Sequence, residues 1–359
     1  MRAMVASFRR WLRKPNQPEL YYIAPGVNWV LDWEAKYITR EVEKQFGLKA
    51  SISRSVSGLS GQIIHCASLW ELTDYVQSRL SRRNAVVGTI YHGQKEDKQF
   101  QGALEKVLDN KGNFVKLHTA SQIMQGRLLA WGVPSEKVTL IPEGVDLKNF
   151  YPVTKDQRLK KREQLGIPAG AFCIGSFHKD GVGMGDGNDP KMIKGPDIFL
   201  KVIEAVNKHH PVFVLLSAPA RGYVKSGLEN LGIQYRHVVL DDYLQVPSLY
   251  HAADLYLMTS REEGGPKAVL ESMATGIPVV ATQVGLVPDV IIDGETGLLA
   301  DSEDIETLAG HVLTLISRLD LRQRLVEGSL KSVRKYDWPL IATRYYHEIY
   351  EPILAELAH

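Results

Sequence analysis

The sequence contains only two cysteines among its 359 residues, Cys66 and Cys173, and each lies inside an apolar run. Two cysteines so far apart have neither the spacing of a metal site nor the density of a disulfide-stabilised secreted domain. We therefore expect both to be reduced core residues of a cytoplasmic protein. The sequence also lacks an apolar run long enough to span a bilayer and an N-terminal apolar segment of signal-peptide length, so secretion is not expected.

An excess of charge of one sign is also lacking. The 43 lysines and arginines are balanced by 41 aspartates and glutamates, which leaves a formal net charge of +2. A nucleic-acid-binding protein would show a clustered basic excess, so we expect no nucleic-acid partner. The local exception is residues 1–14, where basic residues surround apolar ones at helical spacing. Such a helix can make peripheral contact with an anionic membrane, or it can pack its apolar side on its own domain.

Short β-branched runs alternate with longer amphipathic segments from residue 19 onward. This alternation predicts an α/β protein whose parallel sheets are covered by helices on both faces. Because 359 residues exceed one ordinary core and six strands fall in each half, we expect two Rossmann-like domains. The expected strands are 20–25, 49–54, 62–67, 85–91, 114–119 and 138–142 in the first half, and 172–177, 212–217, 236–240, 254–259, 277–282 and 297–300 in the second.

The domain boundary is expected near residues 142–157, where two prolines and a glycine follow the last strand of the first half. We assign residues 1–148 to an N-terminal domain and 149–335 to a C-terminal domain. The amphipathic segment 336–359 comes after the last strand, and we expect it to cross back onto the N-terminal domain.

The stretch GGPKAVLESMATGIP, residues 264–278, has residues typical of the start and the end of a short helix. Gly265 suits the cap, Pro266 the first helical position and Gly276 the C-terminal exit. The free N–H groups at such a helix start favour an anion, so we expect a phosphate there. The expected donors are the backbone N–H groups of Gly264, Gly265, Lys267 and Ala268.

Carboxylates flank this phosphate site. Glu263 precedes the glycine turn and Glu271 lies to one side of the helix. A carboxylate accepts charge-assisted hydrogen bonds from a vicinal diol, so these two glutamates indicate a ligand with sugar hydroxyls. We interpret Glu262 as a solvated loop carboxylate.

Glu263 and Glu271 are separated by seven residues, and MATGIPVVAT and DGETGLL follow them. This pattern resembles the E-x7-E signature of retaining GT-B glycosyltransferases, in particular glycosyltransferase family 4. The resemblance covers residues 138–300 and is weak over the first 110 residues. It includes LIPEGVDLKNFYP, KGPDIFLKVIEAV and VPSLYHAADLYLMTS, which begin at residues 140, 194 and 246.

The resemblance implies a GT-B fold whose two domains face each other across a cleft. It implies transfer of a sugar from a UDP- or GDP-sugar to a hydroxyl acceptor with retention of configuration, in the synthesis of a glycan, glycolipid or cell-envelope polysaccharide. No metal or other cofactor is implied. The location it implies is cytoplasmic, with residues 1–14 as the candidate contact with the inner face of the membrane.

The resemblance also assigns roles to individual residues. Glu263 would face the donor-sugar hydroxyls and Glu271 the ribose hydroxyls. Lys194 would stabilise the diphosphate leaving group. His92, which is followed by Gly93 after the expected strand 85–91, takes the place of a histidine that family members carry close to the donor sugar.

Two features depart from the family pattern. Ser176 stands where the family has an arginine beside the diphosphate, and His178, Lys179 or Lys191 can supply the missing cation. Otherwise the diphosphate site is weaker. The glycine-rich stretch 179–191 is longer than the usual connection and fits neither phosphate-loop nor dinucleotide-binding patterns. It is either a lid over the phosphate site or an ordinary mobile loop.

The acceptor site is expected after the first strand, where the family often has a glycine-rich loop but this chain has only Gly26. Trp29 and Trp33 lie four residues apart on an expected helix and can stack on a sugar or lipid acceptor, or pack in the core. His118 ends another strand and is a further acceptor candidate. His65 is expected in the core.

Two other functions stay open on the sequence alone. The same architecture serves sugar-nucleotide epimerases, which need additional acid–base groups. The serine at position 176 is also compatible with a non-catalytic protein that binds a nucleotide sugar as a partner.

Overall fold

The β-branched runs of the sequence form two six-stranded sheets in a computed structural model that describes residues 18–26, 30–78, 83–183 and 185–357. Each expected strand is present, with ends that differ from the prediction by at most two residues. The strands of the first sheet are β1 (Leu20–Ile23), β2 (Ala50–Ser53), β3 (Ile63–Cys66), β4 (Ala85–Thr89), β5 (Lys116–Thr119) and β6 (Val138–Leu140). Those of the second are β7 (Phe172–Ser176), β8 (Val212–Ser217), β9 (Tyr235–Val238), β10 (Leu255–Met258), β11 (Val279–Thr282) and β12 (Leu298–Ala300).

By internal contacts, the chain divides into two compact units. Unit 1 comprises Met1–Thr89, Gly102–Leu117 and Ala342–His359, and unit 2 comprises Ile90–Gln101 and His118–Ile341. The predicted boundary between residues 148 and 149 differs from this division, because it separates the strands of the first sheet from those of the second. It stays a prediction.

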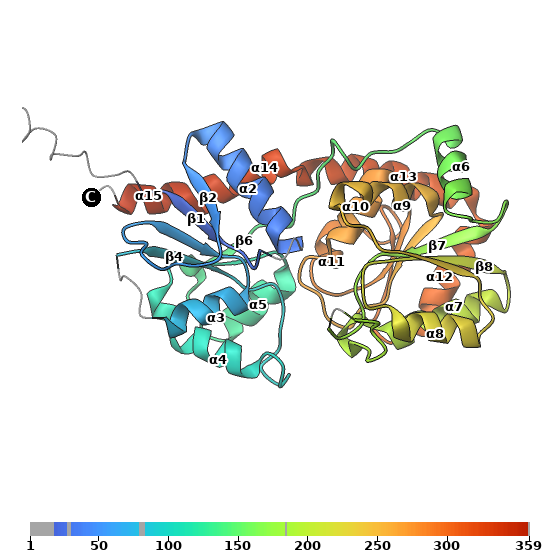
Figure 1. The fold of residues 1–359 in the computed structure, drawn as a ribbon, viewed down its shortest axis with the longest axis horizontal. Helices are drawn as coiled ribbons and strands as arrows, with labels where there is room; N and C mark the ends of the chain where they lie inside the picture. The colour runs from blue at the N-terminus through green and yellow to red at the C-terminus, as the bar shows by residue number, and fades with distance from the viewer. Residues whose placement is uncertain (1–17, 27–29, 79–82, 184, 358–359) are drawn as a thin grey trace, which may run out of the picture. The chain divides into compact units, whose positions relative to one another are not determined.

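The first sheet has the order β2-β1-β3-β4-β5-β6. The helices that follow its strands are α2 (Val30–Phe46), α3 (Leu69–Gln77), α4 (Gln101–Asp109) and α5 (Gln122–Ala130). Within unit 1, α2 and the C-terminal helices lie on one face of the strands, and α3 and α4 lie on the other (Figure 1). Strand β1 pairs in parallel with both β2 and β3, so its Tyr22 is level with Ile52 on one side and His65 on the other.

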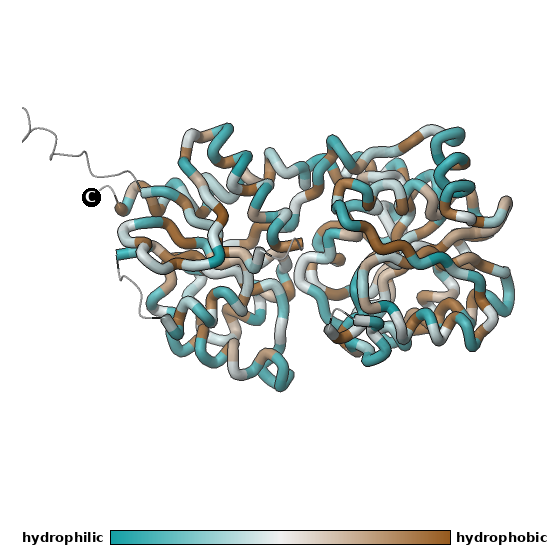
Figure 2. The backbone as a smooth tube through the Cα atoms, in the orientation of Figure 1, coloured by the Kyte–Doolittle hydropathy of each residue, from teal (hydrophilic) through white to brown (hydrophobic). Residues whose placement is uncertain are grey.

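The second sheet has the order β12-β11-β10-β7-β8-β9, in which every neighbouring pair is parallel. Figure 2 shows hydrophobic residues along the strands of this sheet, of which β7, β8, β10, β11 and β12 are buried at every residue and β9 is partly exposed. Ile174 and Val214 pack against α7 (Pro196–Asn207), α8 (Gly222–Asn230) and α12 (Ile305–Ser317). The alternating residues Cys173 and Phe213 pack on α9 (Pro247–Ala252) on the opposite face. The remaining helices of this half are α6 (Lys155–Gln164), α10 (Lys267–Thr275), α11 (Val287–Val290) and α13 (Leu319–Ser332).

The C-terminal segment consists of α14 (Trp338–Tyr345), a π-helical turn (Tyr346–Tyr350) and α15 (Glu351–Leu357). From Ala342 onward the segment belongs to unit 1 and packs on its strands, as predicted. The hydroxyl of Tyr350 lies 2.7 Å from Nδ1 of His65, whose Nε2 lies 2.9 Å from Oγ1 of Thr89. The Tyr346 ring stacks on Phe46 of α2 with 3.9 Å between centroids. His65 is therefore a fully paired core residue, which confirms its prediction.

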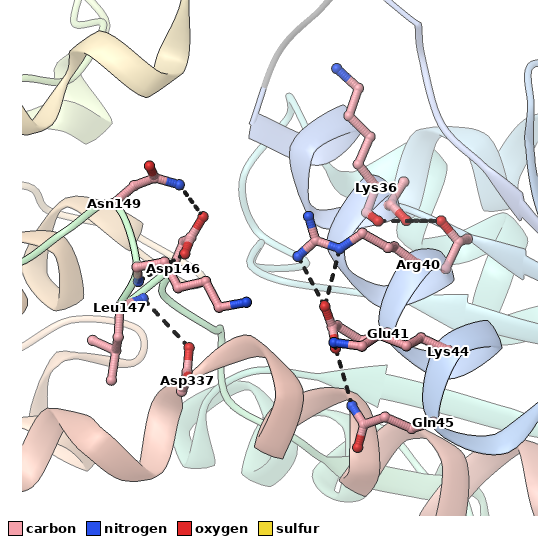
Figure 3. Close-up of polar contacts among 12 residues, drawn as sticks. Lys36, Arg40, Glu41, Lys44, Gln45, Asp146, Leu147, Asn149 and Asp337 are labelled. Carbon is pink, nitrogen blue, oxygen red and sulfur yellow. Dashed lines mark hydrogen bonds and ion pairs between the residues drawn. The ribbon is translucent and has the colours of Figure 1, made fainter.

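Two carboxylates fix the segment of unit 2 in which the chain leaves β6 and later returns (Figure 3). Asp146 accepts hydrogen bonds from the backbone N–H of Lys148 at 3.0 Å and from Nδ2 of Asn149 at 2.6 Å. Asp337, at the start of α14, accepts a hydrogen bond from the N–H of Leu147 at 3.4 Å. The predicted boundary region is therefore an ordered turn.

On α2 of unit 1, the buried Glu41 carboxylate is also fully engaged (Figure 3). It accepts hydrogen bonds from Nε of Arg40 at 3.1 Å and from Nε2 of Gln45 at 3.4 Å. These partners lie on α2 itself, so the buried carboxylate is paired within its own helix.

Both cysteines are free and buried, and burial raises the pKa of each thiol. Among the described residues, no helix combines the length and the apolar character needed to cross a bilayer. The basic stretch 1–14 and Trp29 lie outside the described residues.

Candidate active site

The glycine turn and the helix of the E-x7-E stretch form close to their predicted positions. Helix α10 spans Lys267–Thr275, and Gly276 ends it with a left-handed φ of 73°, as predicted. The prediction for the helix start was wrong by one residue. Pro266 is the N-cap, with ψ of 91°, so the Gly264–Gly265 turn lies wholly before the helix.

The two glycines of this turn are required by close packing. A Cβ on Gly264 would lie 2.4 Å from Cβ of Tyr91, and a Cβ on Gly265 would lie 2.2 Å from Cγ of Glu143. The carbonyl of Gly264 accepts a hydrogen bond from the N–H of Leu286 at 2.8 Å. Any side chain here would displace the turn that carries Glu263, because real Cβ atoms do not approach so closely.

Glu263 is paired with Lys194 inside unit 2. Nζ of Lys194 lies 2.7 Å from Oε2 of Glu263, and the Ser260 hydroxyl donates to Oε1 at 2.8 Å. Burial by itself would raise the pKa of Glu263. The Lys194 ammonium and these hydrogen bonds outweigh burial, so the pKa lies below its ordinary value and the carboxylate is ionised at neutral pH.

The turn that carries Lys194 is joined to the turn that carries Glu263. The carbonyl of Ile193 accepts the N–H groups of Arg261 at 2.8 Å and Glu262 at 3.0 Å. Gly195 follows with a left-handed φ of 61°, and a Cβ there would lie 1.8 Å from the carbonyl oxygen of Thr259. Gly195 is thus needed after Lys194, because only glycine lets the two turns approach so closely.

Glu271 is buried on α10 and engaged by two tyrosines. The Tyr243 hydroxyl donates to Oε1, and the Tyr250 hydroxyl donates to Oε2 at 2.8 Å. Burial raises the pKa of Glu271, and the two tyrosine hydrogen bonds only partly oppose that rise. Both carboxylate oxygens therefore already accept hydroxyl donors.

The Lys267 side chain lies apart from the glycine turn's N–H groups. Its Nζ lies 3.4 Å from Oε2 of Glu143 and 5.3 Å from the centre of the Trp338 ring. The two charged side chains are only 6% and 4% exposed. Because the ammonium is directed to Glu143, a phosphate-binding role for Lys267 rests on its backbone N–H alone.

Near Ser176, the cation is Arg221, a residue that the sequence analysis did not identify. Its Nη2 donates to Oγ of Ser176 at 3.0 Å, its Nη1 donates to the carbonyl of His178 at 2.7 Å, and its Nε lies 3.0 Å from Oδ2 of Asp180. The Arg221 side chain is fully buried. Arg221 therefore holds Ser176, His178 and Asp180 in place through these contacts. No motif marks it, because it starts a helix 45 residues after Ser176.

Two of the three suggested replacement cations, His178 and Lys191, have lowered pKa values. Burial lowers the pKa of His178 to about 3, with Arg221 adding to the effect, so its ring is neutral at physiological pH and the suggestion was wrong for this residue. The pKa of Lys191 is also lowered, by burial and by the ammonium groups of Lys179 and Lys194. Lys191 therefore lies within electrostatic range of both Lys179 and Lys194.

The glycine-rich stretch 179–191 is an ordered hairpin in its described part, from which residue 184 is left out. The N–H of Lys191 donates to Asp180 and that of Val182 donates to Asp189, both at 2.8 Å. Its far end is fastened to the start of α8, where the N–H of Gly222 donates to the carbonyl of Asp186 at 2.6 Å. Whether this hairpin is a lid or a mobile surface loop stays a prediction.

His92 lies just after β4, as predicted. Its ring meets Phe100 edge-on at 5.0 Å, and its buried Nδ1 has no hydrogen-bond partner among the described residues. Burial lowers the pKa of His92, and the positive charge of Lys194 adds to this, so the imidazole is neutral at neutral pH. A neutral ring with an unpaired nitrogen can hydrogen-bond a sugar hydroxyl.

Glu262 is not the solvated carboxylate that the sequence indicated, because the residue is only 8% exposed. Its Oε1 accepts the N–H of Gly93 at 3.2 Å, and its Oε2 accepts Nε2 of Gln94 at 3.2 Å. Both terminal nitrogens of Arg127 also donate to it. The sequence could not show this pairing, because the arginine lies 135 residues earlier on α5.

Comparisons with known proteins identify the class. Residues 185–318, which include α10 and both glutamates, match the family model described as "Glycosyl transferases group 1". The D-inositol 3-phosphate glycosyltransferase of Corynebacterium urealyticum is 25% identical over 310 residues, which cover 82% of this chain and 70% of that protein. The lipopolysaccharide core biosynthesis mannosyltransferase LpsB of Rhizobium meliloti is 27% identical over 207 residues, 55% of each chain. The chain carries a glycosyltransferase group 1 domain, and the protein is a glycosyltransferase.

Solved structures support the fold of this glycosyltransferase. Anabaena Alr3699/HepE in complex with UDP matches with a TM-score of 0.74 and 18% identity, over 94% of this chain and all of that one. The sucrose-phosphate synthase of Thermosynechococcus elongatus matches with a TM-score of 0.66 and 20% identity, over 91% of this chain and 79% of that one. The two parallel sheets are therefore those of a GT-B fold, as predicted.

The acceptor candidates of the glycosyltransferase have mixed surroundings. Gly26 has a left-handed φ of 69°, and its N–H donates to Oδ1 of Asp32 at 2.7 Å. The Trp33 ring is covered by Nζ of Lys36 at 4.1 Å. His118 is fully buried and its Nε2 lies 2.9 Å from the carbonyl of Ile141, so the structure gives it a core position and its acceptor prediction was wrong. Within the described ranges, no group of three or more His, Cys, Asp or Glu side chains could hold a metal ion.

Proposed function

We propose that the glycosyltransferase is a retaining, family 4-like enzyme that moves a sugar from a UDP- or GDP-sugar to a hydroxyl acceptor. The observation that carries this proposal is the ionised Glu263, paired with Lys194 at 2.7 Å, beside the neutral His92. The carboxylate can bind sugar hydroxyls, and the ammonium can bind a diphosphate. The neutral imidazole can lie beside the charge that develops on the sugar. Solved relatives with this fold bind UDP and UDP-glucose.

In this proposal the diphosphate binds where positive charge is concentrated. Lys194 stabilises the leaving group, and Lys179 and Lys191 add the charge that the serine at position 176 cannot supply. The N–H groups of the turn before α10 and of the first two residues of α10 face the phosphates. These donors are those of Gly264, Gly265, Lys267 and Ala268. The reaction is metal-independent, because cationic side chains supply the electrostatic stabilisation.

The nucleoside is held by Glu271, which accepts hydrogen bonds from the ribose hydroxyls. The tyrosine hydroxyls of Tyr243 and Tyr250 now occupy one acceptor direction on each oxygen and hold the carboxylate in one orientation. A carboxylate has about four acceptor sites, so a diol can still bind to it.

Transfer proceeds on one face of the sugar. The leaving phosphate oxygen takes the proton of the acceptor hydroxyl, which forms the new glycosidic bond on the face from which the nucleotide departs. Glu263 is engaged by Lys194 and Ser260 and orients the sugar hydroxyls, rather than acting as a covalent nucleophile. Gly26, Trp29 and Trp33 are the acceptor-binding candidates. The acceptor is a growing glycan, a glycolipid or an envelope polysaccharide precursor, met at the cytoplasmic membrane face through residues 1–14.

A panel of UDP-, GDP- and ADP-sugars tests this function. Calorimetry with each sugar nucleotide should give binding to a UDP- or GDP-sugar, and addition of acceptors should release the nucleotide in the presence of a chelator. Proton NMR of the product should show the anomeric configuration of the donor. An inverted product would refute retention, loss of activity with chelator would refute metal independence, and sugar conversion without acceptor would indicate an epimerase.

A further inference from the structure

The turn of residues 91–94 is held at both peptide groups of one residue, Gly93. The N–H of Gly93 donates to Oε1 of Glu262 at 3.2 Å, and the carbonyl of Gly93 accepts Nη1 of Arg127 at 3.1 Å. The same Arg127 donates through both terminal nitrogens to Glu262. The glutamate, the arginine and the glycine backbone thus form a closed ring of hydrogen bonds, which we call the Gly93 clamp.

The clamp acts on the turn that carries His92. Gly93 has a φ of 130°, a conformation that other residues rarely adopt, and a Cβ there would lie 3.1 Å from Cγ of Phe100. The His92 ring packs on the same phenylalanine. On the opposite side, Tyr91 lies against Gly264 of the turn that carries Glu263. A change in the Gly93 backbone would therefore move His92 relative to Glu263.

The charges of the clamp are well placed for a rigid contact. Arg127 lies in the last turn of α5, where the helix dipole favours a cation. The side chains of Arg127 and Glu262 are 25% and 10% exposed, so solvent screens the pair only weakly. A bidentate arginine–carboxylate contact also fixes orientation, which a lysine cannot reproduce.

We propose that Glu262 and Arg127 are positioning residues of the glycosyl transfer, which set the place of His92 through the backbone of Gly93. The inference rests on the proposed function of His92 at the donor sugar. Glu262 precedes the glutamate that faces the sugar, so one short turn both binds the donor and orients the histidine.

The test compares Glu262→Gln and Arg127→Lys with wild type for kcat, donor KM and nucleotide affinity. Misplacement of a reacting group should lower kcat roughly ten- to hundredfold. Donor KM and nucleotide Kd should stay within about twofold, because Lys194 and Glu271 are untouched. Arg158→Lys is the matched control, since Arg158 pairs with Asp254 at 2.6 Å elsewhere in unit 2, and it should leave kcat unchanged.

A double-mutant cycle separates positioning from a general loss of structure. In a His92→Gln background, Glu262→Gln should cause no further fall in kcat, because the residue that it positions is gone. An equal fall in both backgrounds would overturn the proposal, as would full kcat in both clamp variants.

A measurement without substrate keeps the inference separate from the proposed function. The ring ¹³Cε1 signal of His92, assigned by comparison with His92→Gln, should move in Arg127→Lys and stay in place in Arg158→Lys. An unmoved signal in Arg127→Lys refutes the clamp. If the signal moves in Arg127→Lys but the wild-type protein turns over no nucleotide sugar, the proposed function is refuted and the clamp remains supported.

Discussion

Oε2 of Glu263 lies 2.7 Å from Nζ of Lys194, although 69 residues separate them in the chain. The contact joins the turn before α10 to the turn before α7. Because the Lys194 ammonium lowers the pKa of Glu263, this carboxylate is ionised although it is buried. An ion pair of this kind holds both groups in place before any ligand arrives.

Replacement of Lys194 by glutamine should therefore affect both activity and stability. Loss of the ammonium should lower kcat at least tenfold, because the diphosphate leaving group loses charge stabilisation. The free energy of unfolding should fall by about 1–3 kcal/mol, because Glu263 keeps a buried charge without its partner. Steady-state kinetics and urea unfolding measure the two effects. Full kcat in Lys194→Gln would remove the leaving-group assignment.

Replacement of Glu271 by alanine should weaken nucleotide binding. Two charge-assisted hydrogen bonds to the ribose are lost, for about 1–3 kcal/mol, or a Kd roughly 5- to 150-fold higher. Calorimetry with UDP and GDP measures this change. Unchanged affinity would show that Glu271 serves only to hold Tyr243 and Tyr250.

Replacement of Gly264 by alanine should disturb the site through packing alone. The added methyl would lie 2.4 Å from Cβ of Tyr91, so the 91–94 turn must shift and kcat should fall more than tenfold. Gly310→Ala is the control: a methyl there meets no atom within 4 Å on α12, and the change should leave activity intact and raise stability by about 0.4–1 kcal/mol. Equal kcat in both variants would contradict the packing argument.

Acid stability should depend on His178, whose pKa burial lowers from 6.5 to about 3. Between these pH values the unfolded chain binds a proton that the native state does not, so stability falls as pH falls, by about 1.4 kcal/mol per pH unit. In His178→Gln this contribution disappears. The loss of unfolding free energy from pH 7 to pH 5 should then be about 2 kcal/mol smaller than in wild type. His209→Gln, at an exposed position, should match wild type; if His178→Gln also matches it, the ring is not buried as a neutral group.

Arg221 should matter for folding more than for substrate binding. Arg221→Met leaves Asp180 as a buried charge without its partner and should cost about 3–5 kcal/mol of unfolding free energy. The double variant Arg221→Met with Asp180→Leu should recover part of this loss, since no unpaired charge remains. Chemical unfolding of the three proteins checks the order. If the double variant is less stable than Arg221→Met, the loss does not come from an unpaired Asp180 charge.

The sequence predicted the strands, the C-terminal return and the neighbourhood of Glu263 because these depend on local patterns. β-Branched runs define strands, and parallel strands place their carboxyl ends at one edge, which brought Ser176 and Glu263 into consideration. The residues that it missed, Arg127 and Arg221, act through contacts across 135 and 45 residues. Local periodicity carries no record of such pairings.

The errors have a similar origin. Glu262 was interpreted as solvated because an acidic residue in a loop usually is, and only its partner changes that. The pairing of the Lys267 ammonium with Glu143 was likewise not predicted, and the predicted role of the Lys267 backbone N–H stays a prediction. His118 ends a strand as His92 does, yet its ring turns into the core. The position of a residue in a strand predicts where its Cα lies, but tertiary packing decides the direction of its side chain.

The hairpin 179–191 is fastened at two independent places, at its base by Asp180 on Arg221 and at its far end by Asp186 on Gly222. Lys194 has its own attachment, through Ile193, to the backbone of Arg261 and Glu262. The number of residues between Ser176 and Lys194 therefore does not set the distance between them. The contact of Lys194 with Glu263 is therefore held by attachments that do not include the hairpin.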